Sequence, residues 1–185
     1  FAEKGFEVVS VEEIAAKAGV SKPVVYEHFG GKEGLYAVLV DREMNDLLAS
    51  MTDALTGSSA RALLEQAGMA LFDYIDTNPD GFRILVRDSP VSQAGGSFAS
   101  LIVDVAAQVE HLLASQFASH DISTKYAAVY SQALVGMVAL TGQWWLDVRK
   151  PRKEEVVSHL VNLAWNGLEH LEAKPSLRKV GATKR

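Results

Sequence analysis

Apolar residues recur at helical spacing along nearly the whole of this chain of 185 residues. No convincing alternation with a period of two, which would indicate half-buried strands, is found, and no strand–helix–strand unit is visible. A chain of this length can bury one core of ordinary size, or form a small head on a larger body. We therefore predict an all-α fold.

The composition excludes several classes of protein. The chain has no cysteine, which rules out disulfide scaffolds, thiolate metal sites and cysteine nucleophiles. No apolar run approaches the roughly 18 residues of a membrane span, and no signal peptide is visible in the first residues. We expect a cytoplasmic protein without a membrane partner.

Patterns for catalysis or metal binding are incomplete. The four histidines beyond residue 100 have no partner at a convincing ligand spacing. The stretch 30–34 lacks the Ser/Thr of a phosphate loop, and 95–99 lacks the last glycine of a nucleophile elbow. The sequence therefore predicts no enzyme activity, no metal and no cofactor.

Capping and breaking residues set the first helix boundaries. Ser10, followed three residues later by Glu13, is typical of a capping box and predicts a helix from Val11. Gly19 ends this helix, because glycine adopts the left-handed conformation at little steric cost. Residues 1–4 have the pattern of a helix end, so we expect the first helix to be incomplete in this chain.

A second short helix follows after a tight turn. Ser21 can cap it, and Pro23 fits its first turn, where no intrahelical amide is needed. It runs to about Phe29, and two glycines break it before a longer helix over residues 32–55. Two helices of about eight residues each, separated by a turn, predict a helix-turn-helix unit.

The two faces of this second helix differ. Val25 and Phe29 share one face, which we expect to pack on the first helix at Ile14, Ala15 and Ala18. The opposite face is then free. It carries hydrogen-bond donors and a small apolar group, which are the side-chain types that contact base-pair edges. Its members are Lys22, Val24, Tyr26 and His28.

Lys32 places a positive charge at the start of the third helix. A cation in the first turn opposes the helix dipole and costs a few tenths of a kcal/mol. A phosphate docked there would reverse the sign of this interaction. The alternative is a solvated surface lysine.

A family resemblance rests on the same segment. Residues 19–36 read G-V-S-K-P-V-V-Y-E-H-F-G-G-K-E-G-L-Y, and S-V-E-E-I-A-A-K-A precedes them. This pattern resembles the DNA-binding head of the TetR family of bacterial transcriptional repressors, over about residues 1–48. The resemblance implies base-reading positions at Lys22, Pro23 and Val24 and phosphate contacts at Ser10, Tyr26, His28 and Lys32, and the capping Ser21 completes the predicted DNA-binding set.

The charge of the head argues in the other direction. Residues 1–50 carry nine acidic and five basic side chains, a net charge of −4, and Glu27 lies within the second short helix. The N-terminal arm usual in the family, often basic, is absent from this chain. The alternative is therefore a helical small-molecule-binding protein that has lost DNA binding.

Further helices are predicted beyond a Gly/Ser/Thr break at residues 56–59. They cover about 61–77, 79–89, 98–119, 123–148 and 153–171, with a flexible loop at 89–97. We divide the chain into a helix-turn-helix head at 1–47, a larger helical ligand-binding and dimerisation body at 48–173 and a basic, disordered tail at 174–185.

The resemblance also implies a homodimer through the last two long helices. Small or modest side chains there would permit close helix approach. The candidates are Ala128, Ser131, Val135, Ala139 and Gly142 on the first helix, and Val157, Leu160, Val161, Ala164 and Leu168 on the second. Packing within one chain explains them equally well.

An effector pocket is expected inside the body, by the same resemblance. The candidate lining suggests a small, largely apolar or aromatic effector, although plain core packing explains most members individually. The candidates are Phe72, Tyr74, Phe82, Phe98, Tyr130, Met137, Gln143, Trp144 and Trp145. The resulting prediction is a TetR-like repressor that binds a palindromic double-stranded DNA operator as a homodimer and is released by this effector.

Overall fold

The structure, a computed structural model, describes residues 1–57, 59–87, 98–119, 122–172 and 174–176. Its helices are α1 (Val11–Ala18), α2 (Lys22–Phe29), α3 (Lys32–Ala54), α4 (Ala60–Thr77), α5 (Pro79–Val86), α6 (Phe98–Ser119), the short 3-10 helix η1 (Thr124–Tyr126), α7 (Ala127–Val148) and α8 (Lys153–Glu169). The described part contains no strand, and the all-α prediction is confirmed. The predicted loop at 89–97 and most of the tail lie outside the described residues.

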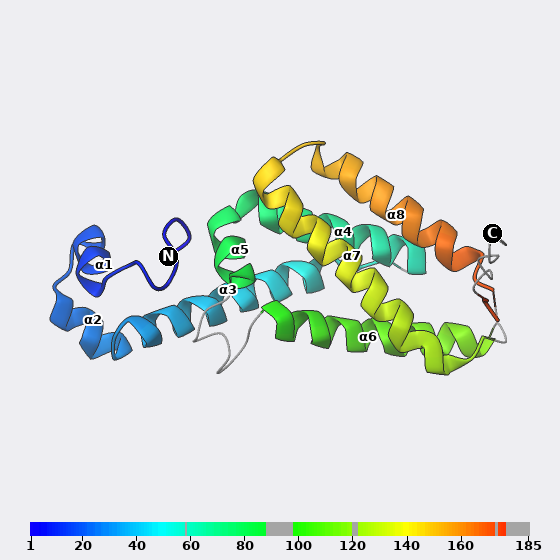
Figure 1. The fold of residues 1–185 in the computed structure, drawn as a ribbon, viewed down its shortest axis with the longest axis horizontal. Coiled ribbons are helices and arrows are strands. Elements are labelled where there is room, and N and C mark those ends of the chain that lie inside the picture. Colours follow the sequence, from blue (N-terminus) through cyan, green and yellow to red (C-terminus); the bar gives the residue numbers. More distant parts are fainter. Residues whose placement is uncertain (58, 88–97, 120–121, 173, 177–185) are drawn as a thin grey trace, which may run out of the picture.

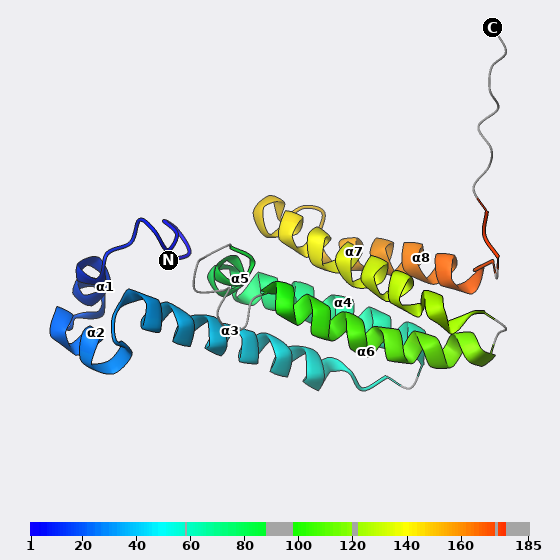
Figure 2. The same cartoon turned by 60° about the horizontal axis from the view of Figure 1, so that its bottom comes forward.

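The molecule is elongated, with a small head at one end (Figure 1). α1 and α2 form this end, and α3 leads from them along the body. In the body, α3 lies on one side, α7 and α8 lie on the other, and α4 and α6 lie between them (Figure 2). α3 continues without a break through residues 47 and 48, where we placed the boundary between head and body.

Local chemistry sets the ends of the head helices. The hydroxyl of Ser10 accepts a hydrogen bond from the Glu13 amide at 3.2 Å, which starts α1. The Glu13 carboxylate pairs with Lys4 instead of returning to Ser10, so one half of the predicted capping box forms. Gly19 and Gly30 end α1 and α2 with φ of 68° and 72°, in the left-handed region that favours glycine.

The head has its own small core. Val25 of α2 is buried with Val11 and Ala15 of α1, as predicted for Val25 and Ala15. Phe29 stays 36% exposed, and Ala18 is exposed. Phe29 is the last residue of α2, so the packing centres on Val25 near the middle of the helix, and the expectation for Phe29 was wrong.

Aromatic side chains tie the N-terminal segment to α3. The rings of Phe1 and Phe6 meet the ring of Tyr36 edge to face at 5.1 Å and 5.0 Å. Gly5 lies between them with φ of 83°, and its amide donates to the Phe1 carbonyl at 2.7 Å. This cluster belongs to the main core, which continues through α3, α4, α5, α7 and α8 and holds the head on the body.

α6 is long and apolar enough to cross a membrane by length and composition alone, with a mean hydropathy of 1.3 over its best window. The expectation that no segment would meet this criterion was therefore wrong. The helix packs along α7 and buries Phe98 and Leu101. Asp104 and Glu110 interrupt its exposed side, and each would cost about 2.5–3.5 kcal/mol at the centre of a bilayer. We describe α6 as a helix of the body.

Candidate functional site

The exposed side of α2 carries the predicted contact residues. Lys22, Pro23, Tyr26 and His28 are exposed, and Val24 is partly exposed. Ser10 and Ser21 are also exposed, one before each short helix, and Ser21 occupies the N-cap position of α2 without a side-chain hydrogen bond there. The structure thus brings seven of the eight predicted residues to the accessible surface of the helix-turn-helix unit.

Lys22 is held by a carboxylate from the other short helix. Its ammonium forms an ion pair with Glu12 of α1 and lies 5.6 Å from the centroid of the Tyr26 ring. The hydrogen bond between the two side chains raises the pKa of Lys22 and lowers the pKa of Glu12. Any anion that binds Lys22 must compete with this exposed pair.

Lys32, the eighth predicted residue, has partners within the chain. Its Nζ donates to the carbonyl oxygen of Phe6 at 2.9 Å and lies 4.5 Å from the centre of the Phe6 ring. The Glu7 carbonyl oxygen lies 3.4 Å away. These contacts offset the unfavourable position of the ammonium at the start of α3, so the helix-dipole argument alone does not require a phosphate.

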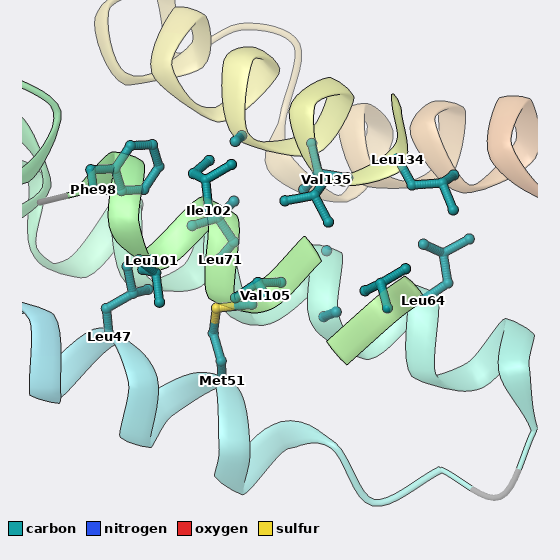
Figure 3. A pocket seen from close by; sticks show the side chains of 15 residues that line it. Leu47, Met51, Leu64, Leu71, Phe98, Leu101, Ile102, Val105, Leu134 and Val135 are labelled. Atoms are coloured by element: carbon teal, nitrogen blue, oxygen red, sulfur yellow. The ribbon is translucent and has the colours of Figure 1, made fainter. Parts of the chain in front are cut away.

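A cavity of about 130 Å³ lies in the body between α3, α4, α6 and α7 (Figure 3). Its lining consists of Leu47, Met51, Leu64, Ala67, Gly68, Leu71, Phe98, Leu101, Ile102, Val105, Val109, Leu134, Val135, Val138 and Ala139. Every one of these residues is apolar. The cavity is partly open to the surface and its wall is apolar, so it suits burial of a hydrocarbon group.

The cavity overlaps the predicted pocket at one residue, Phe98. Phe72, Tyr74, Phe82 and Trp145 are instead buried in the main core, where the Phe72 and Trp145 rings lie 5.4 Å apart. Trp145 Nε1 also donates to the Pro151 carbonyl at 2.8 Å, which fixes the ring. These four rings fill the core, and the cavity is lined mainly by aliphatic side chains, with Phe98 as its one aromatic residue.

The remaining predicted lining residues lie on other parts of α7. The ring of Tyr130 packs edge to face on Phe117 at 5.4 Å. Trp144 is 50% exposed, and Met137 and Gln143 are partly exposed. The signal that was missed is the small Ala67 in α4, between two leucine-bearing turns. The neighbouring Gly68 makes room for α8, since a Cβ there would lie 3.0 Å from Val157 Cγ1.

Six of the ten predicted dimer residues of α7 and α8 are buried within the chain, and the other four, Ala128, Val135, Leu160 and Leu168, are partly exposed. The buried six are Ser131, Ala139, Gly142, Val157, Val161 and Ala164. A Cβ on Gly142 would lie 2.9 Å from Ile75 Cδ1, so this glycine permits close packing of α7 on α4. Intramolecular packing, the alternative left open by the sequence, accounts for these six positions.

The exposed side of α7 carries several large apolar side chains, and the mostly polar exposed side of α8 carries one. Leu140 is 65% exposed on α7, and Leu163 is 65% exposed on α8. Gly136 of α7 and Gly167 of α8 have no atom of this chain within 4 Å of an added Cβ. Leu140, Leu163, Gly167, Val129, Ala133 and Trp144 are exposed and Gly136 is partly exposed, and together they form what we term the outer face of α7 and α8.

The described residues contain no group of three or more His, Asp or Glu side chains able to hold a metal ion. Arg83 of α5 forms ion pairs with Asp80 at 3.4 Å and with Asp147 of α7 at 3.3 Å. It serves as a surface ion-pair partner at the junction of α5 and α7.

A helix-turn-helix head carried on a larger helical body is the architecture of a DNA-binding transcriptional regulator. Residues 1–39 match the family model for bacterial regulatory proteins of the tetR family, and residues 61–167 match the tetracyclin repressor-like C-terminal domain. The chain belongs to the TetR family of transcriptional regulators, which are DNA-binding transcription factors and not enzymes.

Individual relatives agree with this assignment. The chain is 31% identical over 181 residues to the HTH-type transcriptional activator FasR of Mycolicibacterium smegmatis, covering 92% of this chain and 78% of the relative. A TetR-like transcriptional regulator from Rhodococcus sp. RHA1 has a TM-score of 0.73 at 24% identity, with 92% and 90% of the two chains covered. The fatty acid degradation regulator FadR from Bacillus halodurans has a TM-score of 0.72 at 16% identity, with the same coverage.

Proposed function

We propose that this protein binds a palindromic operator as a homodimer and that an aliphatic ligand in the body controls this binding. The head, residues 1–47, would place α2 in the major groove, and the body, residues 48–173, would dimerise and hold the ligand. The observation that carries the proposal is that Lys22, Tyr26 and His28, all possible hydrogen-bond donors, are exposed on α2 while Val25 is buried. A regulator of this kind acts in the cytoplasm, where its operator is.

Selection of bound sequences from a random duplex library tests the DNA-binding part. An enriched palindrome, with an affinity that falls steeply with salt, is expected because phosphate contacts release counterions. No enrichment, or salt-independent binding, would favour the alternative function, a helical ligand-binding protein without an operator. The acidic head motivates that alternative.

Substitutions on α2 and at the start of α3 separate base contacts from phosphate contacts. Lys22→Ala is expected to weaken operator binding by about 1–3 kcal/mol and to relax the preference at one base position. Tyr26→Phe and Lys32→Ala are expected to weaken binding to all duplexes nearly equally. Repeating the selection with each variant measures both effects, and an unchanged base preference for Lys22→Ala would remove its base-reading role.

Glu12→Gln is expected to strengthen DNA binding. The change frees Lys22 from a solvent-exposed ion pair, which contributes little, so the affinity should rise by a few-fold at most. Fluorescence anisotropy with labelled operator measures this gain. Glu7→Gln removes an exposed acid of the head that forms no salt bridge in the described structure, and an equal gain there would show that general charge, not the Lys22 pair, is responsible.

The outer face of α7 and α8 supports the proposed dimer. Exposed large apolar side chains together with two open glycines suit close approach of a second copy. Two symmetric heads are also what a palindromic operator requires.

The fully apolar lining of the cavity supports an aliphatic ligand. It offers no side-chain hydrogen-bond partner, so a bound group gains by burial of hydrocarbon alone. Isothermal titration with saturated n-alkanoates from hexanoate to hexadecanoate tests this class. Aromatic acids are the contrast set, because the sequence alone allowed an aromatic effector.

Ala67→Phe is expected to abolish binding of the n-alkanoates. The new ring occupies the cavity between α4 and α6, which leaves too little volume for a ligand. Ala107→Phe on the exposed side of α6 is the matched control and should bind like the wild type. Wild-type affinity in Ala67→Phe would place the ligand elsewhere.

We propose a repressor, in which ligand binding lowers operator affinity. By linkage, operator DNA must then weaken ligand binding by the same factor. A reporter gene behind the selected operator gives the sign of regulation directly. Lower expression without ligand supports repression, whereas higher expression would make this protein an activator, the role that the name of the mycobacterial relative states for that relative.

A further inference from the structure

A carboxylate lies where the connecting helix α3 meets the short helix α5. The Tyr74 hydroxyl of α4 donates a hydrogen bond to Oε2 of Glu43 at 2.8 Å and lies 3.1 Å from the Glu43 carbonyl oxygen. In the part of the chain that the structure describes, no cation forms a salt bridge with Glu43. A neutral hydroxyl therefore holds this partly buried carboxylate in place.

The Tyr74 hydroxyl stays protonated and so remains a hydrogen-bond donor. Burial, together with the hydrogen bond to Glu43, raises the pKa of Tyr74 far above its ordinary value, so the phenol keeps its proton. Tyr74 itself is almost fully buried in the main core, which fixes the position of the donor.

A glycine provides the space for the carboxylate. A Cβ on Gly81 in α5 would lie 1.9 Å from Oε2 of Glu43 and 2.6 Å from its Cδ. The absence of a Cβ at Gly81 therefore allows direct contact between the backbone of α5 and a side chain of α3.

Both partners of this contact are close to the cavity. Leu47, one turn after Glu43 on α3, lines the cavity, and so does Phe98 of α6 (Figure 3). The Phe98 ring meets the ring of Phe82 edge to face at 5.2 Å, and Phe82 is the neighbour of Gly81. A ligand that fills the cavity presses on Leu47 and, through Phe98 and Phe82, on α5.

We propose that a ligand in the cavity moves the head through one contact, between the Glu43 carboxylate and Gly81, which the Tyr74 hydroxyl holds in place. We term this contact the joint. The inference rests on the proposed effector function and names the contact that transmits it. Because α3 is one helix from Lys32 to Ala54, a displacement at Glu43 is carried to the start of α3 beside α2. Glu43, Tyr74 and Gly81 do not line the cavity and lie outside α1 and α2, so they act as positioning residues.

Gly81→Ala is the sharpest test, because it displaces the carboxylate without changing Glu43 or Tyr74. The clash involves the end of a flexible side chain, and alanine favours the helix, so the variant should fold. With dodecanoate as the probe, wild-type operator affinity is expected to fall by about 10-fold or more. In Gly81→Ala, dodecanoate should bind as in the wild type and change operator affinity by less than about twofold.

Tyr74→Phe should show the same loss of response, since it removes the donor and keeps the ring. Glu43→Gln can still accept the Tyr74 hydrogen bond, so it is expected to retain most of the response to dodecanoate. Tyr130→Phe is the matched tyrosine control, because that ring packs on Phe117, away from α3 and α5. A full response to dodecanoate in Gly81→Ala and Tyr74→Phe would overturn the proposal.

Hydrogen exchange of the ligand-free protein tests the proposed Glu43–Gly81 contact separately from the proposed effector class. Glu43→Ala changes no residue of α5, yet the α5 amides are expected to exchange several-fold faster once this anchor is lost. Unchanged α5 exchange would overturn the joint, whatever ligands do. If dodecanoate leaves wild-type operator affinity unchanged, the proposed effector class is wrong, and the exchange result still decides whether Glu43 anchors α5.

Discussion

Leu140→Glu is expected to give a folded monomer that binds the operator at least about 100-fold more weakly than the wild type. The two-fold axis of a dimer would place two such carboxylates in an apolar interface, where each unpaired charge costs several kcal/mol. Leu140 is 65% exposed in the single chain, so the glutamate is hydrated in the monomer and the fold is retained. A monomer brings one head to DNA instead of two, which loses the gain from linked binding.

Analytical ultracentrifugation gives the state of association, and fluorescence anisotropy gives the operator affinity of the same sample. The matched control is Leu112→Glu, since Leu112 is 59% exposed on α6, outside the outer face of α7 and α8. It should remain a dimer and bind DNA normally. A Leu140→Glu protein that sediments as a dimer would show that another surface makes the dimer.

Phe72→Ala is expected to lower the free energy of unfolding by about 3–5 kcal/mol. Phe72 is fully buried and packs on the Trp145 ring at 5.4 Å, so its removal leaves a cavity in the main core. Urea denaturation at one fixed protein concentration measures the loss, because the stability of a dimer depends on concentration. Leu112→Ala is the exposed control and should stay within about 0.5 kcal/mol of the wild type.

The same variant separates core from ligand site. Because Phe72 does not line the cavity, folded Phe72→Ala should bind n-alkanoates with nearly wild-type affinity. If Phe72→Ala abolished ligand binding and left stability unchanged, Phe72 would be a ligand contact, as the sequence alone suggested.

The helix boundaries could be predicted from the sequence because they depend on neighbouring residues. Ser10, Gly19 and Pro23 each act on the turn they occupy, and the structure places α1 and α2 accordingly. The exposure of Lys22 and Tyr26 followed from the same reasoning, since the side of α2 that carries Val25 is the buried one.

The cavity could not be predicted in this way, because it depends on which faces of four helices meet. Trp144 and Trp145 are adjacent in the sequence, yet one is half exposed and the other is buried. The Glu43–Tyr74 bond joins residues 31 positions apart, and nothing near Glu43 in the sequence indicates its partner. The sequence identifies apolar residues, but it does not indicate whether they pack in the core or line the cavity.

The uninterrupted α3 has a consequence for building hybrid regulators. A helix advances about 1.5 Å and turns about 100° with each residue, so adding one residue between Tyr36 and Leu47 would rotate the head by about that angle relative to the body. A head grafted from another family member must therefore keep the residue count of α3 as well as its own contact residues. The phase of this helix, as much as the chemistry of α2, determines which spacing of operator half-sites a pair of heads can reach.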